Sequence, residues 1–189
     1  VWQSLAGSGI NVTSNIHLSY SANGGTTWLA TDLRVNDVAD SAELPVIATD
    51  GNGRVYIAWR DGRDDEAEVF ADVFDTATGT LAGNQALSGD EAAEQITITA
   101  AEGTDRAYVT WTDLRAAKKA IRMNRTSDGG DTWAADGIIV NRDSQFADCT
   151  NADVAAQGSN VVVAWQDGRS GQPDIYVNRS TNGGATFAN

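Results

Sequence analysis

Three loops of the chain carry side chains that could bind a ligand, because in each an aspartate precedes an arginine by two positions. The pairs are Asp61 and Arg63, Asp113 and Arg115, and Asp167 and Arg169. A planar guanidinium donates two parallel hydrogen bonds to a carboxylate, so these Asp-x-Arg loops could recognise a glycan or an acidic ligand. Each aspartate could instead pair with its own arginine, cap its loop or bridge neighbouring units. Recurrence in every unit favours the structural interpretation, and the six residues remain ligand-binding candidates.

The loops belong to a repeat of roughly 53 residues. Trp59, Trp111 and Trp165 precede them and lie 52 and 54 residues apart. A second motif, which we call the Gly-Gly turn, occupies residues 21–28, 126–133 and 180–187 with the sequences SANGGTTW, TSDGGDTW and STNGGATF. Asn-Gly and Asp-Gly are strong hairpin signals, since glycine adopts positive φ without strain. A degenerate copy at residues 75–79 places four turns on one period, and counted with it the turn at 126–133 is the third.

Each period contains short apolar or alternating runs and no useful helical periodicity, which indicates β-strands. Four antiparallel strands in about 53 residues is the size of one propeller blade. The sequence therefore predicts an all-β fold of about 3.5 β-propeller blades in a single repeat domain. We expect a partial blade over residues 1–37, blades over 38–90 and 91–143, and a partial blade over 144–189. Such a ring is incomplete, so we expect the remaining blades in a longer chain or in a second copy.

The Gly-Gly turns resemble the Asp-box, or bacterial neuraminidase repeat, of sialidase-like β-propellers, whose pattern is Ser/Thr-x-Asp-x-Gly-x-Thr-Trp/Phe. Residues 126–133 match it fully, and the other two turns have Asn for Asp. The resemblance implies structural turns between the third and fourth strands of a blade, on the face away from the ligand site. The residues with this implied structural role are Asn23, Gly25, Thr27, Trp28, Asp128, Gly130, Thr132, Trp133, Asn182, Gly184, Thr186 and Phe187. It also places the Asp-x-Arg loops on the ligand-binding face.

The family's catalytic set is not recognisable in this chain. The resemblance implies an Arg-Ile-Pro motif, three arginines, an acidic acid/base and a tyrosine nucleophile activated by glutamate. The nearest trace of the motif is the Glu-Leu-Pro at residues 43–45, and Tyr56 and Tyr108 occupy equivalent positions typical of the core. We assign no catalytic residue. We expect a non-catalytic extracellular propeller segment that binds a glycan or protein or acts as a scaffold; the alternative is part of a sialidase-like exo-glycoside hydrolase.

Composition excludes several other functions. The net charge of −13 disfavours nucleic acid as a partner, and no apolar stretch is long enough for membrane insertion. One cysteine, Cys149, precludes an intrachain disulfide, and one histidine, His17, disfavours a histidine metal site. We expect no cofactor, with calcium at the acidic run 61–66 as the one candidate ion. Few lysines and many Asp, Thr, Gly and Ala are typical of a bacterial exported protein, so we expect an extracellular or cell-surface location.

Overall fold

The computed structural model describes residues 1–8, 11–38, 41–63, 67–89, 92–134, 137–141 and 147–188. These residues form strands, turns and loops and contain no helix, which confirms the predicted all-β fold. In the described ranges no helical segment is long and apolar enough to cross a membrane.

Four antiparallel sheets follow one another along the chain, and we call them blades 1 to 4. Blade 1 contains β1 (Trp2–Ser8), β2 (Asn11–Leu18) and β3 (Leu33–Arg34), which correspond to the second, third and fourth strands of the other blades because Trp2 aligns with Trp59. Blade 2 contains β4 (Ala42–Thr49), β5 (Arg54–Asp61), β6 (Glu68–Asp75), β7 (Thr80–Leu81) and β8 (Gln85–Ala86). Blade 3 contains β9 (Ala93–Ala101), β10 (Arg106–Asp113), β11 (Ala120–Thr126) and β12 (Ile138–Ile139). Blade 4 contains β13 (Cys149–Gln157), β14 (Asn160–Asp167) and β15 (Asp174–Ser180).

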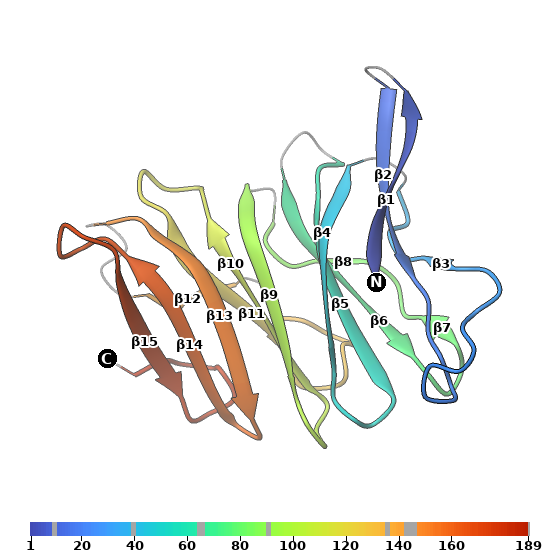
Figure 1. Cartoon of the computed structure of the whole chain (residues 1–189). Coiled ribbons are helices and arrows are strands. Elements are labelled where there is room, and N and C mark those ends of the chain that lie inside the picture. The colour runs from blue at the N-terminus through green and yellow to red at the C-terminus, as the bar shows by residue number, and fades with distance from the viewer. Residues whose placement is uncertain are drawn as a thin grey trace.

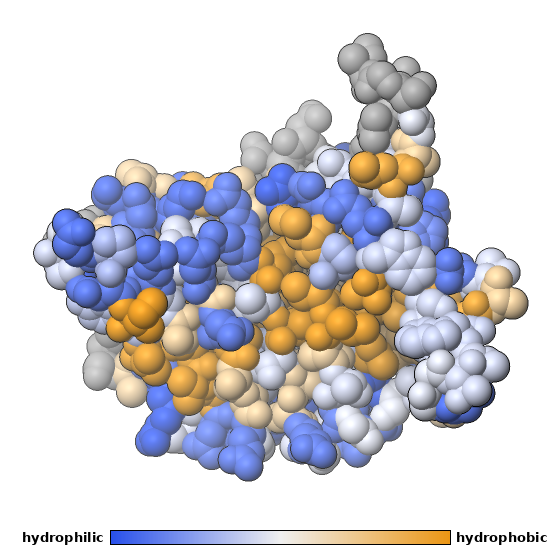
Figure 2. Space-filling view, in the orientation of Figure 1, coloured by the Kyte–Doolittle hydropathy of each residue, from blue (hydrophilic) through white to orange (hydrophobic). Residues whose placement is uncertain are grey.

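The blades stand side by side in chain order and form an open arc, with the N-terminus in blade 1 and the C-terminus beyond blade 4 (Figure 1). Within blade 3 the strand order is β9, β10, β11 and β12, so each strand pairs with its neighbour in sequence. The first strands β4, β9 and β13 line one face of the arc (Figure 1). Figure 2 shows hydrophobic residues gathered across the middle of that face, with hydrophilic residues along its two ends.

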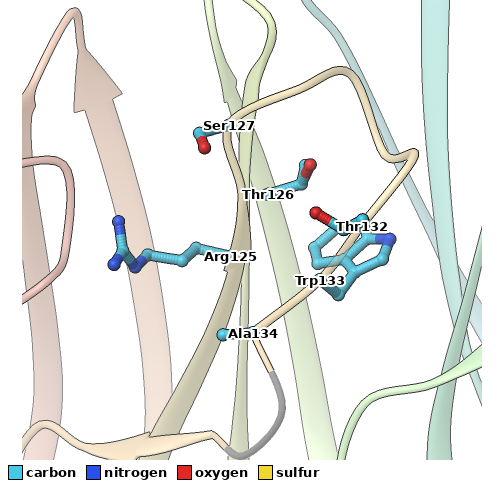
Figure 3. Close-up of a pocket in the computed structure, with 6 residues that line it drawn as sticks. All are labelled: Arg125, Thr126, Ser127, Thr132, Trp133 and Ala134. Atoms are coloured by element: carbon cyan, nitrogen blue, oxygen red, sulfur yellow. The ribbon is translucent and has the colours of Figure 1, made fainter.

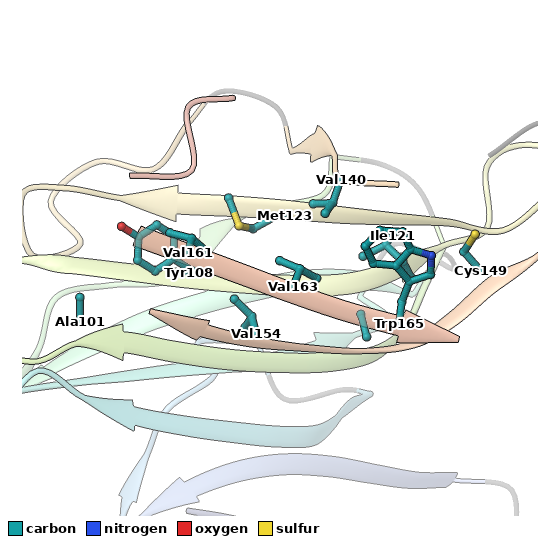
Figure 4. Packing of buried hydrophobic residues seen from close by; sticks show 11 residues of the cluster. Ala101, Tyr108, Ile121, Met123, Val140, Cys149, Val154, Val161, Val163 and Trp165 are labelled. Atoms are coloured by element: carbon teal, nitrogen blue, oxygen red, sulfur yellow. The ribbon is translucent and has the colours of Figure 1, made fainter. Parts of the chain in front are cut away.

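The core lies between blades, because the alternating side chains of each strand point toward the preceding blade on one side and the following blade on the other. Tyr108 and Met123 of blade 3 pack against Val161 and Val163 of blade 4 (Figure 4). Trp59, Trp111 and Trp165 are all buried, as are Tyr56 and Tyr108, which confirms the predicted core position of the two tyrosines. The sequence repeat therefore reflects a packed interface that recurs between successive sheets.

A second recurring contact fixes the fourth strand in blades 1, 2 and 3. The side-chain oxygens of Asn36, Ser88 and Asn141 accept hydrogen bonds from the backbone N–H groups of Ile16, Val69 and Ile121, at 2.7 to 2.9 Å. All three acceptors are buried, so each offsets the cost of an otherwise unpaired N–H on the third strand.

The Gly-Gly turns lie at the end of the blades opposite the Asp-x-Arg loops, since they follow the third strand rather than the second. In the third turn, Asp128 Oδ1 accepts from Thr132 N at 3.0 Å and Thr126 Oγ1 accepts from Gly130 N at 2.9 Å. The side-chain and backbone hydrogen bonds from Thr132 hold the pKa of Asp128 at about 2. Asn23 and Asn182 accept the corresponding backbone hydrogen bonds at 2.9 and 3.0 Å, so the amide replaces the carboxylate in the same turn.

Candidate functional site

The first Asp-x-Arg loop closes on itself. Arg63 donates from Nε to Asp61 Oδ1 at 3.0 Å and from Nη2 to Asp61 Oδ2 at 2.8 Å, and Trp59 Nε1 donates to the same Oδ2 at 2.9 Å. Burial opposes ionisation of Asp61, but the hydrogen bonds from Arg63 and Trp59 outweigh it and lower the pKa of this carboxyl. The Arg63 guanidinium also stacks on the Phe70 ring, with 3.9 Å between Cζ and the ring centroid.

The loop of blade 4 repeats this arrangement. Arg169 donates from Nε and Nη2 to Asp167 Oδ2 at 3.0 and 2.5 Å, and its guanidinium lies over the Tyr176 ring. Cys149 Sγ lies 3.2 Å from the same carboxylate oxygen. Burial first, and then the Asp167 carboxylate, raise the pKa of the Cys149 thiol to about 12, so this buried cysteine is protonated and inert.

Blade 3 departs from the pattern because an arginine replaces the stacking aromatic. Arg122 stands opposite Trp111, at the position that Phe70 and Tyr176 occupy in blades 2 and 4. The Nε atoms of Arg122 and Arg115 lie 2.5 and 2.7 Å from Asp113 Oδ2. The buried indole N–H of Trp111 has no hydrogen-bond partner among the described atoms, unlike its counterparts Trp59 and Trp165.

The Asp-x-Arg loops also tie neighbouring blades together. Arg63 Nη1 lies 2.9 Å from Asp37, which follows the fourth strand of blade 1, and Arg115 Nη2 donates to the Ser88 carbonyl of blade 2 at 3.0 Å. The structure thus brings each aspartate to its own arginine, with the three aspartates buried and the arginines partly so. This geometry agrees with the structural interpretation, in which the aspartates pair with their arginines, cap their loops and bridge neighbouring blades. Ligand binding by the six side chains stays a prediction.

A different set of polar groups lies beside these loops, on the first strand of each blade. Leu44, Gln95 and Asn151 each have φ near +54°, at a bulge in β4, β9 and β13 respectively. Positive φ is uncommon for residues other than glycine and is strained for a side chain such as leucine. Because the bulges pair with the ends of β5, β10 and β14, they lie at the same end of the blades as the Asp-x-Arg loops.

The bulges of blades 3 and 4 are joined by side-chain amides. Gln95 Nε2 donates to Asn151 Oδ1 at 2.7 Å, and Gln95 Oε1 accepts from Asn151 N at 2.8 Å. Thr112 Oγ1 donates to Gln95 Oε1 at 2.9 Å, and Asn151 Nδ2 donates to Gln166 Oε1 at 2.8 Å. Gln95 and Asn151 are exposed, so this chain of hydrogen bonds runs along a solvent-facing edge.

Ion pairs continue this edge. Arg60 Nη2 lies 2.6 Å from Glu43 Oε1, and Lys119 Nζ lies 3.1 Å from Glu94 Oε2, with all four side chains between 30% and 39% exposed. We define the inner rim as the bulge residues and their polar neighbours: Glu43, Leu44, Arg60, Glu94, Gln95, Thr112, Lys119, Asn151 and Gln166. Two equivalent rim positions carry a different residue in each blade, Leu44, Gln95 and Asn151 at one and Arg60, Thr112 and Gln166 at the other. The aspartate and arginine of the Asp-x-Arg loops and the two glycines of the Gly-Gly turns recur.

Sequence reasoning missed the inner rim, although a signal for it existed. Alignment of the units on their tryptophans places Arg60, Thr112 and Gln166 at one position, where the repetition breaks. The bulges had no such signal, because no glycine marks the positive φ at Leu44, Gln95 or Asn151. A break in an otherwise regular repeat is typical of a functional position, since a site needs different groups from different blades.

At the opposite end of the blades, a cavity of about 250 Å³ is lined by Arg54, Asp75, Thr80 and Asp131 among others. A cavity of about 170 Å³ beside the third Gly-Gly turn is lined by Arg125, Ser127, Thr132 and Trp133 among others (Figure 3). Arg125 points away from the Trp133 ring and donates from Nη1 to the Gly183 carbonyl of blade 4 at 3.0 Å. The cavity beside the third turn is therefore a gap beside an inter-blade contact.

The candidate calcium site at the acidic run 61–66 falls partly outside the described residues, because residues 64–66 are not among them. In the ranges given above, no cluster of three or more His, Cys, Asp or Glu side chains is arranged to hold a metal ion.

Comparisons with known proteins bear on the fold. No family model and no curated protein matches the chain. Among solved structures, an α-L-arabinofuranosidase from Fusarium graminearum in complex with an iminosugar inhibitor aligns over 78% of this chain and 47% of its own, with a TM-score of 0.53 and 8% identity. The Hadza microbial sialidase Hz136 aligns over 85% of this chain and 42% of its own, with a TM-score of 0.52 and 12% identity. The chain thus spans less than half the length of either protein. With four antiparallel sheets in an open arc and these neighbours, the chain has the β-propeller fold.

Proposed function

We propose that this chain is an extracellular, non-catalytic propeller segment of the Asp-box type whose inner rim binds a carbohydrate. The observation that carries the proposal is the break in symmetry. At the bulge of the first strand the blades present Leu44, Gln95 and Asn151, and at the facing second-strand position they present Arg60, Thr112 and Gln166, while the loop aspartates and arginines recur. A binding site requires different chemical groups at different points around a ligand, whereas a structural repeat does not.

The chemistry of the rim suits a polyhydroxylated ligand. Carboxylates accept hydrogen bonds, guanidinium and ammonium groups donate them, and primary amides do both, so the rim can match hydroxyl groups that donate and accept. The exposed apolar side chains Leu44 and Ile47 of β4 lie on the same strand and can cover the C–H face of a sugar ring. By their names, one solved neighbour is an arabinofuranosidase in complex with an iminosugar, and the other is a sialidase. Both names support a carbohydrate as the ligand class.

An extracellular location is part of this proposal. The acidic composition with few lysines supports it, and so does the proposed ligand, since a protein that binds glycans meets them at cell surfaces and in secretions.

The alternative function, part of a glycoside hydrolase, has one observation in its favour. Glu43 and Glu94 occupy equivalent positions on the first strands of adjacent blades, and glycoside hydrolysis requires two carboxyl groups. Each forms an ion pair with a cation, Glu43 with Arg60 and Glu94 with Lys119. Hydrolysis of p-nitrophenyl arabinofuranoside or a sialoside that is abolished by both Glu43→Gln and Glu94→Gln would establish this alternative.

The binding proposal is tested by isothermal titration of the chain with arabino-oligosaccharides and sialyllactose. We expect binding that Gln166→Ala and Glu94→Gln each weaken by roughly 10-fold, the effect of losing one to two hydrogen bonds to a ligand. Asp131→Asn, an exposed substitution at the opposite end, serves as the matched control and should leave affinity unchanged. Binding that is insensitive to both rim substitutions would refute the proposed site.

A further inference from the structure

The outward face of blade 4 is built like a buried interface yet lies open. Val69, Ile121 and Ile175 stand at one position of the third strand, opposite Arg60, Thr112 and Gln166. Val69 and Ile121 are fully buried beneath the next blade, whereas Ile175 is 74% exposed. Two residues later Ala71 and Met123 are buried and Val177 is 62% exposed. Large neighbouring apolar groups that remain exposed mark an interaction site.

The interior interfaces show what covers this face. The Gly-Gly turns of blades 3 and 4 pack closely on the blade before them, and a Cβ at Gly130 would come within 2.3 Å of Val73 Cγ2. A Cβ at Gly184 would come within 2.5 Å of Met123 Cε. Trp133, which ends the third turn, joins the apolar clusters between blades 2 and 3. The cover is therefore a Gly-Gly turn with its terminal aromatic residue.

The turn of blade 1 covers none of the residues that the structure describes. Gly24 and Gly25 have φ of +67° and +86°, close to the values in the other turns, but a Cβ at either would meet no atom within 4 Å. Trp28, the counterpart of Trp133, is 63% exposed, and Trp2, the counterpart of the buried Trp59, is 39% exposed. The chain thus carries, at opposite ends of the arc, the apolar third-strand face and the Gly-Gly turn that meet at its interior interfaces.

We propose that these two faces dock together between two copies of the chain, head to tail. Arg125 donates to the Gly183 carbonyl across the interface of blades 3 and 4, so Arg179, its counterpart in blade 4, donates to the Gly24 carbonyl of the second copy. Val177 then lies beneath Gly25, as Met123 lies beneath Gly184. The contact joins two different surfaces, so it is heterologous and either closes into a ring or continues as an open array.

The experiment measures mass by light scattering across a concentration series. We expect wild type to exceed the monomer mass of 19.9 kDa. A double variant of the blade 4 face, Ile175→Asp with Val177→Asp, and a variant of the first turn, Trp28→Asp, should each weaken association roughly 30-fold or more, as hot-spot residues do. Leu5→Asp, which changes an apolar residue that is 70% exposed on β1, is the matched control and should associate as wild type. Thermal unfolding followed by circular dichroism verifies that every variant folds.

Mixing the two variants distinguishes the head-to-tail contact from other kinds of association. The blade 4 variant retains an intact first turn, and the Trp28 variant retains an intact blade 4 face, so an equimolar mixture should regain a heterodimer. Association of either variant alone with itself would instead reveal a contact between like surfaces and overturn the proposal. A monomer at every wild-type concentration would also overturn it, and would assign the two faces to flanking blades of a longer polypeptide.

Discussion

The Asp-x-Arg loops and the inner rim lie at the same end of the blades, and they differ in what the repeat conserves. In blades 2 and 4 the loops keep aspartate, arginine, tryptophan and an aromatic platform in one geometry. The rim keeps the backbone bulge but changes the side chain at the bulge, from Leu44 to Gln95 to Asn151. Charged residues that are buried and mutually paired maintain the fold, whereas half-exposed polar residues that vary from blade to blade are free to recognise a ligand.

Substitutions in the Asp-x-Arg loops should therefore lower the free energy of unfolding and leave ligand affinity unchanged. Asp61→Ala leaves Arg63 and the Trp59 indole N–H without their buried acceptor, so we expect the free energy of unfolding to fall by about 3 kcal/mol or more. Urea denaturation measures this loss, with the exposed Asp131→Ala as control. A loss below about 1 kcal/mol together with abolished glycan binding would reverse the roles of the two regions.

The Gly-Gly turns allow the same residue type to be compared with and without a neighbouring blade. Gly130→Ala and Gly25→Ala share the cost of positive φ, about 1 kcal/mol, but only the former drives a methyl group into Val73. We expect Gly130→Ala to cost a further 1–3 kcal/mol in chemical denaturation. Equal losses for the two variants would mean that the turn does not hold the blades together.

Blade 3 is the place where the loop pattern itself varies. Arg122→Phe restores the aromatic residue found in blades 2 and 4 and frees Asp113 to accept from the unpaired Trp111 indole. We expect a gain in stability of about 1 kcal/mol, which differential scanning calorimetry resolves as a rise in Tm. A fall in Tm would show that the Arg122 ion pair is worth more than the stacked aromatic.

Asp128→Asn should have the smallest effect at neutral pH, because Asn already occupies this position in the first and last turns. The folded pKa of about 2 lies below the unfolded value of about 3.9, so ionised Asp128 contributes stability above pH ~4 that is lost as pH falls toward 2. Urea midpoints measured between these pH values should fall less steeply for the variant than for wild type. Parallel curves for the two proteins would contradict the role of the Thr132 hydrogen bonds.

Much of the fold could be read from the sequence because its signals are local and recur. The spacing of Trp59, Trp111 and Trp165, together with the Asn-Gly and Asp-Gly turns, is enough to predict four-stranded blades. Side-chain contacts within and between blades were harder to predict, since they join residues far apart in the chain. Neither the acceptors Asn36, Ser88 and Asn141 nor the pairing of Gln95 with Asn151 follows from a local pattern.

The loops illustrate a different limit. Spacing placed Asp61 and Arg63 two residues apart, but it could not distinguish a pair that binds a ligand from one that binds itself. That distinction depends on burial and on the stacking of Arg63 over Phe70, both of which come from the packing of whole sheets. The sequence signal for the inner rim was the repeat position held by Arg60, Thr112 and Gln166, where the residue differs from blade to blade.

Amide chemical-shift mapping by NMR during titration with the best-binding oligosaccharide tests the central claim most directly. We predict perturbations at residues 43–44, 94–95 and 151 and at Gln166, with the Gly-Gly turns at 126–133 and 180–187 unaffected. Perturbations confined to the cavity beside Arg125 and Trp133, or to the Asp-x-Arg loops alone, would contradict the assignment of the inner rim as the carbohydrate site.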